Sequence, residues 1–72
     1  MQQSPQTTTS NTYYNLVSVL YHALETAQTT SAYIQDAQQS GNQQLVQFFQ
    51  SVQQTANQQA QQAQQLLAQS SR

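Results

Sequence analysis

The spacing of the apolar residues constrains this chain most. From Tyr13 to Ile34 mainly apolar positions follow one another in alternating steps of four and three, and the same alternation returns from Leu45 to Leu66, with Ser31 and Gln59 as polar exceptions. Such steps place side chains on one face of an α-helix, whereas a half-buried strand requires an apolar residue at every second position. We therefore predict two amphipathic helices, each with an apolar seam. The two seams are Tyr13, Val17, Leu20, Leu24, Ala27, Ser31 and Ile34, and Leu45, Phe49, Val52, Ala56, Gln59, Ala63 and Leu66.

The segment Ser40-Gly41-Asn42 separates the two periodic patterns. Gly41 is the only glycine in the chain, and it suits the left-handed residue that follows the end of a helix. Asn42 suits the N-cap of the next helix. The sequence therefore predicts helices over about 13–39 and 43–68, joined by a tight turn.

The ends of the chain lie outside both patterns. Residues 1–11 are polar, include Pro5 and show no periodicity, so we expect a disordered tail. Thr12 is the expected N-cap of the first helix. The helical hairpin then occupies 12–69, and 70–72 are expected to fray at the C-terminus.

The two seams also match one another when the chain folds back about the turn. One register pairs Ile34 with Phe49, Ala27 with Ala56, and Val17 with Leu66. Agreement between turn chemistry and hydrophobic pattern is expected of a sequence that specifies one fold. We therefore predict an all-α fold in which the helices form an antiparallel hairpin.

Further apolar residues flank both seams and make the apolar face wider than one hairpin needs. A domain of this size rarely has a core that supplies more than a few kcal/mol, and a chain without cysteine forms no disulfide to support it. We therefore expect two copies to form a dimeric four-helix bundle with two-fold symmetry. The expected core and interface residues are Tyr13, Leu16, Val17, Leu20, Tyr21, Leu24, Ala27, Ile34, Leu45, Phe48, Phe49, Val52, Ala56, Ala63, Leu66 and Leu67.

Full charges are nearly absent from the chain. Glu25, Asp36 and Arg72 carry the only ones, whereas glutamine takes 20 of the 72 positions. One arginine does not neutralise several phosphates, so neither a nucleic acid nor an anionic membrane surface is an expected partner. No apolar run approaches the roughly 18 residues that span a bilayer. We expect a soluble chain, cytoplasmic if natural or recombinantly expressed, and nothing else indicates its location.

His22 and Glu25 are the weak candidates for a metal site. Spaced i, i+3 on a helix, they share one face, but two ligands are too few for a closed site and the second helix offers no His, Asp or Glu. A solvated surface pair is the preferred interpretation. Asp36 is expected on the outer face, and no general base accompanies a serine or threonine in the seams. We therefore expect no catalytic residue, no cofactor, no small-molecule substrate and no enzyme activity.

Three polar or aromatic features allow two interpretations each. Gln59 either sets the register between helices or extends outwards to water. The tract Gln58–Gln65 is either an interaction segment or, as its regular alanines favour, a helix with a solvated face. The aromatic residues are expected in the core and interface rather than around a ligand. They are Tyr13, Tyr14, Tyr21, Tyr33, Phe48 and Phe49.

Three segments carry a resemblance to a known family. Tyr14–Glu25, Tyr33–Ala37 and Leu45–Phe49 together resemble short bacterial ferritin-like helical-hairpin proteins, and the resemblance covers residues 13–68. It implies that two hairpins pair into a four-helix bundle. In such relatives the outer positions are rich in charged residues, whereas here they are Gln, Asn, Ser and Thr. The resemblance therefore implies an engineered, charge-depleted structural protein without biochemical activity.

Two alternative functions stay open at this stage. The chain is either a ferritin-like protein that binds a metal or a small ligand, or a natural glutamine-rich helical interaction module. The larger ferritin-like families bind metals through inward-facing Glu and Glu-x-x-His groups. The order His22-x-x-Glu25 reverses that motif, so the resemblance assigns no metal ligand to this chain.

Overall fold

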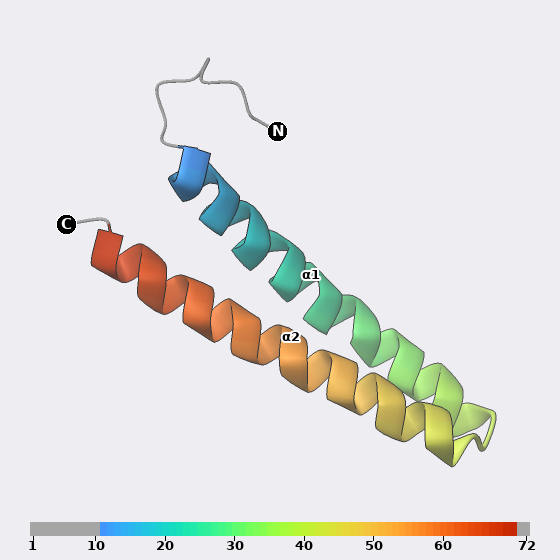
Figure 1. The fold of residues 1–72 in the computed structure, drawn as a ribbon. Coiled ribbons are helices and arrows are strands. Elements are labelled where there is room, and N and C mark those ends of the chain that lie inside the picture. The colour runs from blue at the N-terminus through green and yellow to red at the C-terminus, as the bar shows by residue number, and fades with distance from the viewer. Residues whose placement is uncertain (1–10, 71–72) are drawn as a thin grey trace.

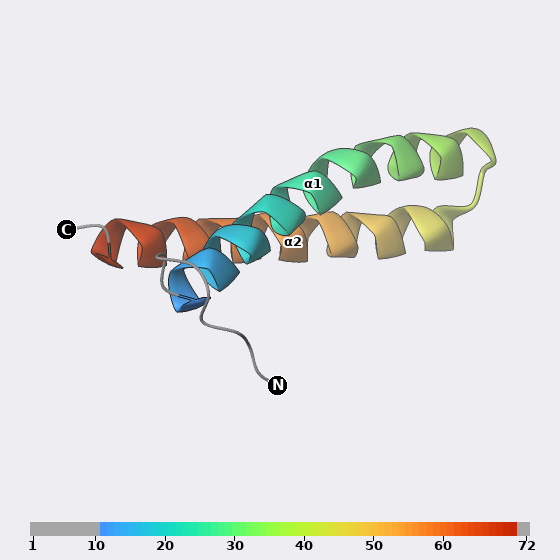
Figure 2. The ribbon, with the colours of Figure 1, turned by 90° about the horizontal axis from the view of Figure 1, so that it is seen from above.

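Two long helices make up the fold. In a computed structural model, which describes residues 11–70, the chain forms α1 (Asn11–Gln39) and α2 (Gln43–Ser70). The helices run antiparallel, so the start of α1 and the end of α2 lie together at the end opposite the turn (Figure 1). Figure 2 shows that α1 crosses α2 obliquely. The predicted all-α hairpin is confirmed.

The observed helices are slightly longer than expected. α1 begins at Asn11, so Thr12 lies within the first helical turn and is not its N-cap, which corrects that prediction. α2 continues to Ser70, the first residue expected to fray. The rest of the predicted tail, residues 1–10, and the rest of the predicted frayed end, residues 71–72, lie outside the described residues. Differences of one or two residues are usual where a helix ends.

Hydrogen bonds close the turn as the sequence predicts. Gly41 has a φ of 74°, and its N–H donates to the carbonyl oxygen of Gln38 at 3.1 Å while the N–H of Asn42 donates to that of Ala37 at 3.1 Å. These two bonds form a Schellman motif. The side-chain oxygen Oδ1 of Asn42 then accepts the N–H of Leu45 at 3.1 Å, which makes Asn42 the N-cap of α2.

The helices meet through small side chains. α1 buries one residue every seven positions, and α2 presents mainly alanines to it. Thr30 is 1% exposed, and its hydroxyl donates to the carbonyl oxygen of Thr26 at 2.6 Å, so its burial leaves no polar atom unsatisfied. Small side chains allow two helix axes to approach closely. The buried residues are Ala23, Thr30, Ala37, Val46, Ala56, Ala60 and Ala63.

The predicted seam of α1 is only partly right for the contact within the hairpin, in which Leu20, Ala27 and Ile34 are half-buried. Val17 and Leu24 are exposed, and the row of Ala23 and Thr30 is buried against α2 in their place. Leu20, Ala27 and Ile34 lie between these two rows on the helix surface. Combined with either row, they give the same alternating steps of four and three. The smaller row is inside because it lets the helices come closer, and the larger side chains then point outwards.

The seam of α2 is rotated in the same way. Leu45, Gln59 and Leu66, which were expected on it, are exposed. The residues that face α1 also repeat in steps of three and four, and they are Val46, Phe49, Gln53, Ala56, Ala60, Ala63 and Leu67. The axial register agrees with the prediction, because Gln53 contacts Ala27 and Ser31.

The hairpin is a single layer of helices. Its principal extents are 50 × 25 × 16 Å, and in the described part of the chain no further element covers either broad side of the helix pair. Side chains on those two sides are therefore open to whatever surrounds the molecule.

We predict that Gly41→Ala lowers the free energy of unfolding by about 1 kcal/mol, since an alanine at positive φ is strained. No heavy atom lies within 4 Å of the added Cβ position, so the cost comes from the backbone conformation. Gly41→Asn is the matched control and loses less, because asparagine tolerates this conformation. Urea denaturation of the three proteins measures the order; equal losses for both substitutions would contradict the assignment.

Candidate functional site

Large apolar side chains lie on the outside of the hairpin. Among the described residues, most buried side chains are alanines, whereas leucine, valine, tyrosine and phenylalanine side chains are exposed on both broad sides. Large exposed apolar patches mark sites of protein–protein interaction or ligand binding. These surfaces are therefore the candidate functional site. The exposed residues are Tyr13, Tyr14, Val17, Val19, Tyr21, Leu24, Tyr33, Leu45, Phe48 and Leu66.

One broad side carries apolar residues from both helices, and we call it the Phe48 face. It consists of Val19 and Tyr33 of α1 and Leu45, Phe48, Val52 and Leu66 of α2. Leu45, Phe48 and Val52 lie at i, i+3 and i+7, which is one stripe of a helix. Aromatic contacts connect the two helices near the turn. The ring of Phe49 lies 5.7 Å from the ring of Tyr33 and 5.8 Å from that of Phe48.

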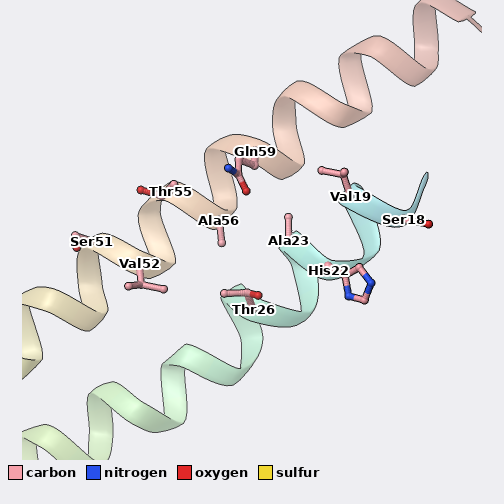
Figure 3. A pocket seen from close by; sticks show the side chains of 10 residues that line it. All are labelled: Ser18, Val19, His22, Ala23, Thr26, Ser51, Val52, Thr55, Ala56 and Gln59. Atoms are coloured by element: carbon pink, nitrogen blue, oxygen red, sulfur yellow. The ribbon is translucent and has the colours of Figure 1, made fainter. Parts of the chain in front are cut away.

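A groove of about 520 Å³ runs along the middle of the Phe48 face. Figure 3 shows the methyl groups of Ala23 and Ala56 pointing into the space between the helices, so the floor is made of small side chains. Val19 and Val52 line its two sides. The groove is open and largely apolar, a shape that receives a side chain rather than encloses a small ligand.

On the opposite broad side, which we call the Tyr21 face, the two helices contribute different kinds of side chain. α1 contributes the large side chains of Tyr14, Val17, Tyr21 and Leu24. α2 contributes amides instead: Gln53 and Asn57 line the groove of about 730 Å³ beside Tyr21 and Leu24. The row of α2 that runs through Asn57 in steps of seven is entirely Gln and Asn. That row is Gln43, Gln50, Asn57 and Gln64.

Gln53 makes a cross-helix contact that sequence reasoning missed. Its Nε2 donates to the carbonyl oxygen of Ala27 and to the hydroxyl Oγ of Ser31, both at 2.8 Å. Gln59, the residue considered for register setting, is exposed beside the Phe48-face groove. The sequence does contain a signal for this contact, because Gln53 is the polar residue in the otherwise apolar row of α2 that starts at Val46 and faces α1.

The candidate metal pair is a surface contact. Nδ1 of His22 lies 3.6 Å from Oε1 of Glu25, with the two side chains 71% and 58% exposed. Within residues 11–70, no three His, Cys, Asp or Glu side chains gather in a group that could hold a metal ion. Exposed pairs of this kind contribute at most about 1 kcal/mol.

The carboxylates are too far apart for shared chemistry. Glu25 and Asp36, both exposed, lie eleven residues apart on the same helix, which is about 16 Å along its axis. Paired acid–base catalysis requires two such groups within reach of one bound substrate. The described part of the chain therefore brings no two carboxylates together.

The hairpin divides the sixteen expected core and interface residues into two groups. Leu16, Leu20, Ala27, Ile34, Phe49, Val52, Ala56, Ala63 and Leu67 are partly or fully buried between the helices. The others are exposed on one of the two broad sides. They are Tyr13, Val17, Tyr21, Leu24, Leu45, Phe48 and Leu66.

Comparisons of the chain with protein-family models, with curated proteins and with solved structures gave no match. The resemblance to ferritin-like hairpins therefore stays a prediction. Neither described helix has a stretch that is both long enough and apolar enough to cross a membrane.

We predict that Gln53→Ala lowers the free energy of unfolding by about 1 kcal/mol relative to Gln54→Ala, because it removes a cross-helix hydrogen bond. Gln54 is exposed on the same helix, so its substitution corrects for the higher helix propensity of alanine. Urea denaturation measures both variants. Identical stabilities would show that the contact of Gln53 contributes nothing.

Proposed function

We propose that this protein is a self-associating structural module in which two hairpins form a homodimeric four-helix bundle, without catalytic activity. One observation carries the proposal: most fully buried residues of the hairpin are alanines, while many larger apolar side chains are exposed. Full burial of a leucine, valine or phenylalanine side chain stabilises by about 1.5–3 kcal/mol, against about 0.8 kcal/mol for one methylene group. Association can therefore release hydrophobic free energy that the single hairpin leaves unused.

The size of the hairpin supports the same proposal. A layer of two helices buries one stripe of each, and most helical stability in proteins comes from packing of such stripes. A chain of 72 residues without disulfides is marginal when it folds alone. A second hairpin supplies the missing layer and is the simplest partner, since it is always present at the same concentration.

We further propose that the neutral surface was introduced by design into a ferritin-like hairpin. Charge is missing at the positions where helices commonly use it: neither α1 nor α2 has an acidic residue in its first turn or a basic residue in its last turn. The signals that need no charge are kept, among them Gly41 after α1 and the Asn42 cap of α2. Loss of charged side chains with retention of the folding signals is the pattern expected of deliberate charge removal.

The first test is the mass of the native particle. Sedimentation equilibrium and light scattering are expected to give twice the 8.1 kDa of one chain. Dilution is expected to lower the melting temperature, because association stabilises a dimer by mass action. A single-chain mass at concentrations where circular dichroism shows intact helices would overturn the proposal.

A second prediction concerns pH and salt. Two carboxylates, one arginine and one histidine leave few groups whose protonation couples to folding, so the melting temperature is expected to stay nearly constant from about pH 3 to pH 9. Salt up to about 1 M is also expected to change the melting temperature little, because few charge interactions are present to be screened. Differential scanning calorimetry across both ranges measures this, and a steep fall on acidification would contradict the proposed charge-free stabilisation.

A further inference from the structure

We infer that the two hairpins associate through the Phe48 face, with the Tyr21 face left in water. The inference rests on the proposed homodimer and adds which side of the hairpin forms the contact. Both sides expose large apolar residues of α1, so the choice between them depends on what α2 contributes and on the shape of the surface.

The difference between the two flanks of α2 decides the choice. On the Phe48 face, the row at steps of seven is Leu45, Val52, Gln59 and Leu66, with Phe48 beside it. On the Tyr21 face, the equivalent row consists of the four amides from Gln43 to Gln64. A partner that covered those amides would have to satisfy each one, because a buried amide without a hydrogen-bond partner destabilises the complex. The row of Leu45, Val52, Gln59 and Leu66 on the Phe48 face holds one amide in the same length.

The polar side chains near the Phe48-face groove tolerate burial better than amides do. Thr26 and Thr55 line it, and a helical threonine can satisfy its hydroxyl on its own backbone. Thr30 already does so in the interior of the hairpin. His22, which also lines the groove, points away from α2 in Figure 3, so a second copy can cover the groove and leave the imidazole at the rim.

The shape of the Phe48 face also fits a second copy. Its groove has a floor of small residues between ridges of larger ones, and a two-fold interface needs a surface that offers both a projection and a hollow to an identical surface. Phe48, 58% exposed, is such a projection. The 50 × 25 Å side of the hairpin is larger than the roughly 800 Å² that each partner buries in a standard interface.

The test compares two double variants matched in residue type and exposure. Val19→Gln with Phe48→Gln changes the Phe48 face, where the two side chains are 50% and 58% exposed. Val17→Gln with Tyr21→Gln changes the Tyr21 face, where they are 38% and 61% exposed. Sedimentation is expected to show a dimer Kd raised at least about a hundredfold for the first variant, because each copy loses two apolar contacts. The second variant is expected to stay within about threefold of the parent.

The outcomes separate the two proposals. If the parent chain is monomeric, the proposed dimer fails before any variant is made, and this inference fails with it. If the parent is dimeric and the Val17–Tyr21 variant dissociates while the Val19–Phe48 variant does not, the dimer stands and the assigned face is wrong. Equal effects of the two variants would also overturn the assignment.

A distance measurement keeps the inference testable if a double variant unfolds. The chain has no cysteine, so a single nitroxide label can be attached at Thr55→Cys, beside the Phe48-face groove, or at Asn57→Cys, beside the Tyr21-face groove. Pulsed electron paramagnetic resonance of each labelled dimer is expected to give the shorter label–label distance at position 55. A shorter distance at position 57 would place the Tyr21 face inside the dimer and overturn the inference.

Discussion

The close approach of two helices through small side chains is the constraint on which the rest of the structure depends. Ala23 and Ala37 of α1, and Ala56, Ala60 and Ala63 of α2, fill the space between the axes. Larger side chains such as those of Leu20, Ile34 and Phe49 are only half-buried beside this contact. Other large apolar side chains lie on the two broad sides. The hairpin consequently has an interior of mainly small side chains and still exposes large apolar side chains that a further layer could cover.

Neutral hydrogen bonds take the place that ion pairs hold in most helical proteins. The turn is closed by backbone bonds around Gly41 and by the Asn42 cap, and the helices are bridged by Gln53. Surface ion pairs usually contribute about 0–1 kcal/mol each, and glutamine is a good helix former. A surface without charge is therefore compatible with this fold. The lack of surface charge instead affects how molecules meet, because little charge repulsion opposes their association.

Among the described residues, the same arrangement brings few reactive groups together and presents apolar surface, which supports the proposed association. Catalysis by side chains depends on several reactive groups that converge on one point, whereas Glu25 and Asp36 lie far apart on one helix and His22 and Glu25 are exposed to solvent. Recognition of another helix surface requires apolar side chains and hollows at helical spacing, and the Phe48 face has both. The proposed homodimer buries the apolar side chains that this surface exposes.

The sequence by itself determined the two helices, the turn and the axial register, because apolar periodicity, a lone glycine and an asparagine cap act within a few residues. It left open which row of each helix faces the other. Steps of four and three run as well through Val17 and Leu24 as through Ala23 and Thr30, so periodicity does not choose between them. Only the tertiary structure decided which row faces the other helix, since that choice depends on how the side chains of both helices fit together at their contact. The contact of Gln53 follows from the same rotation.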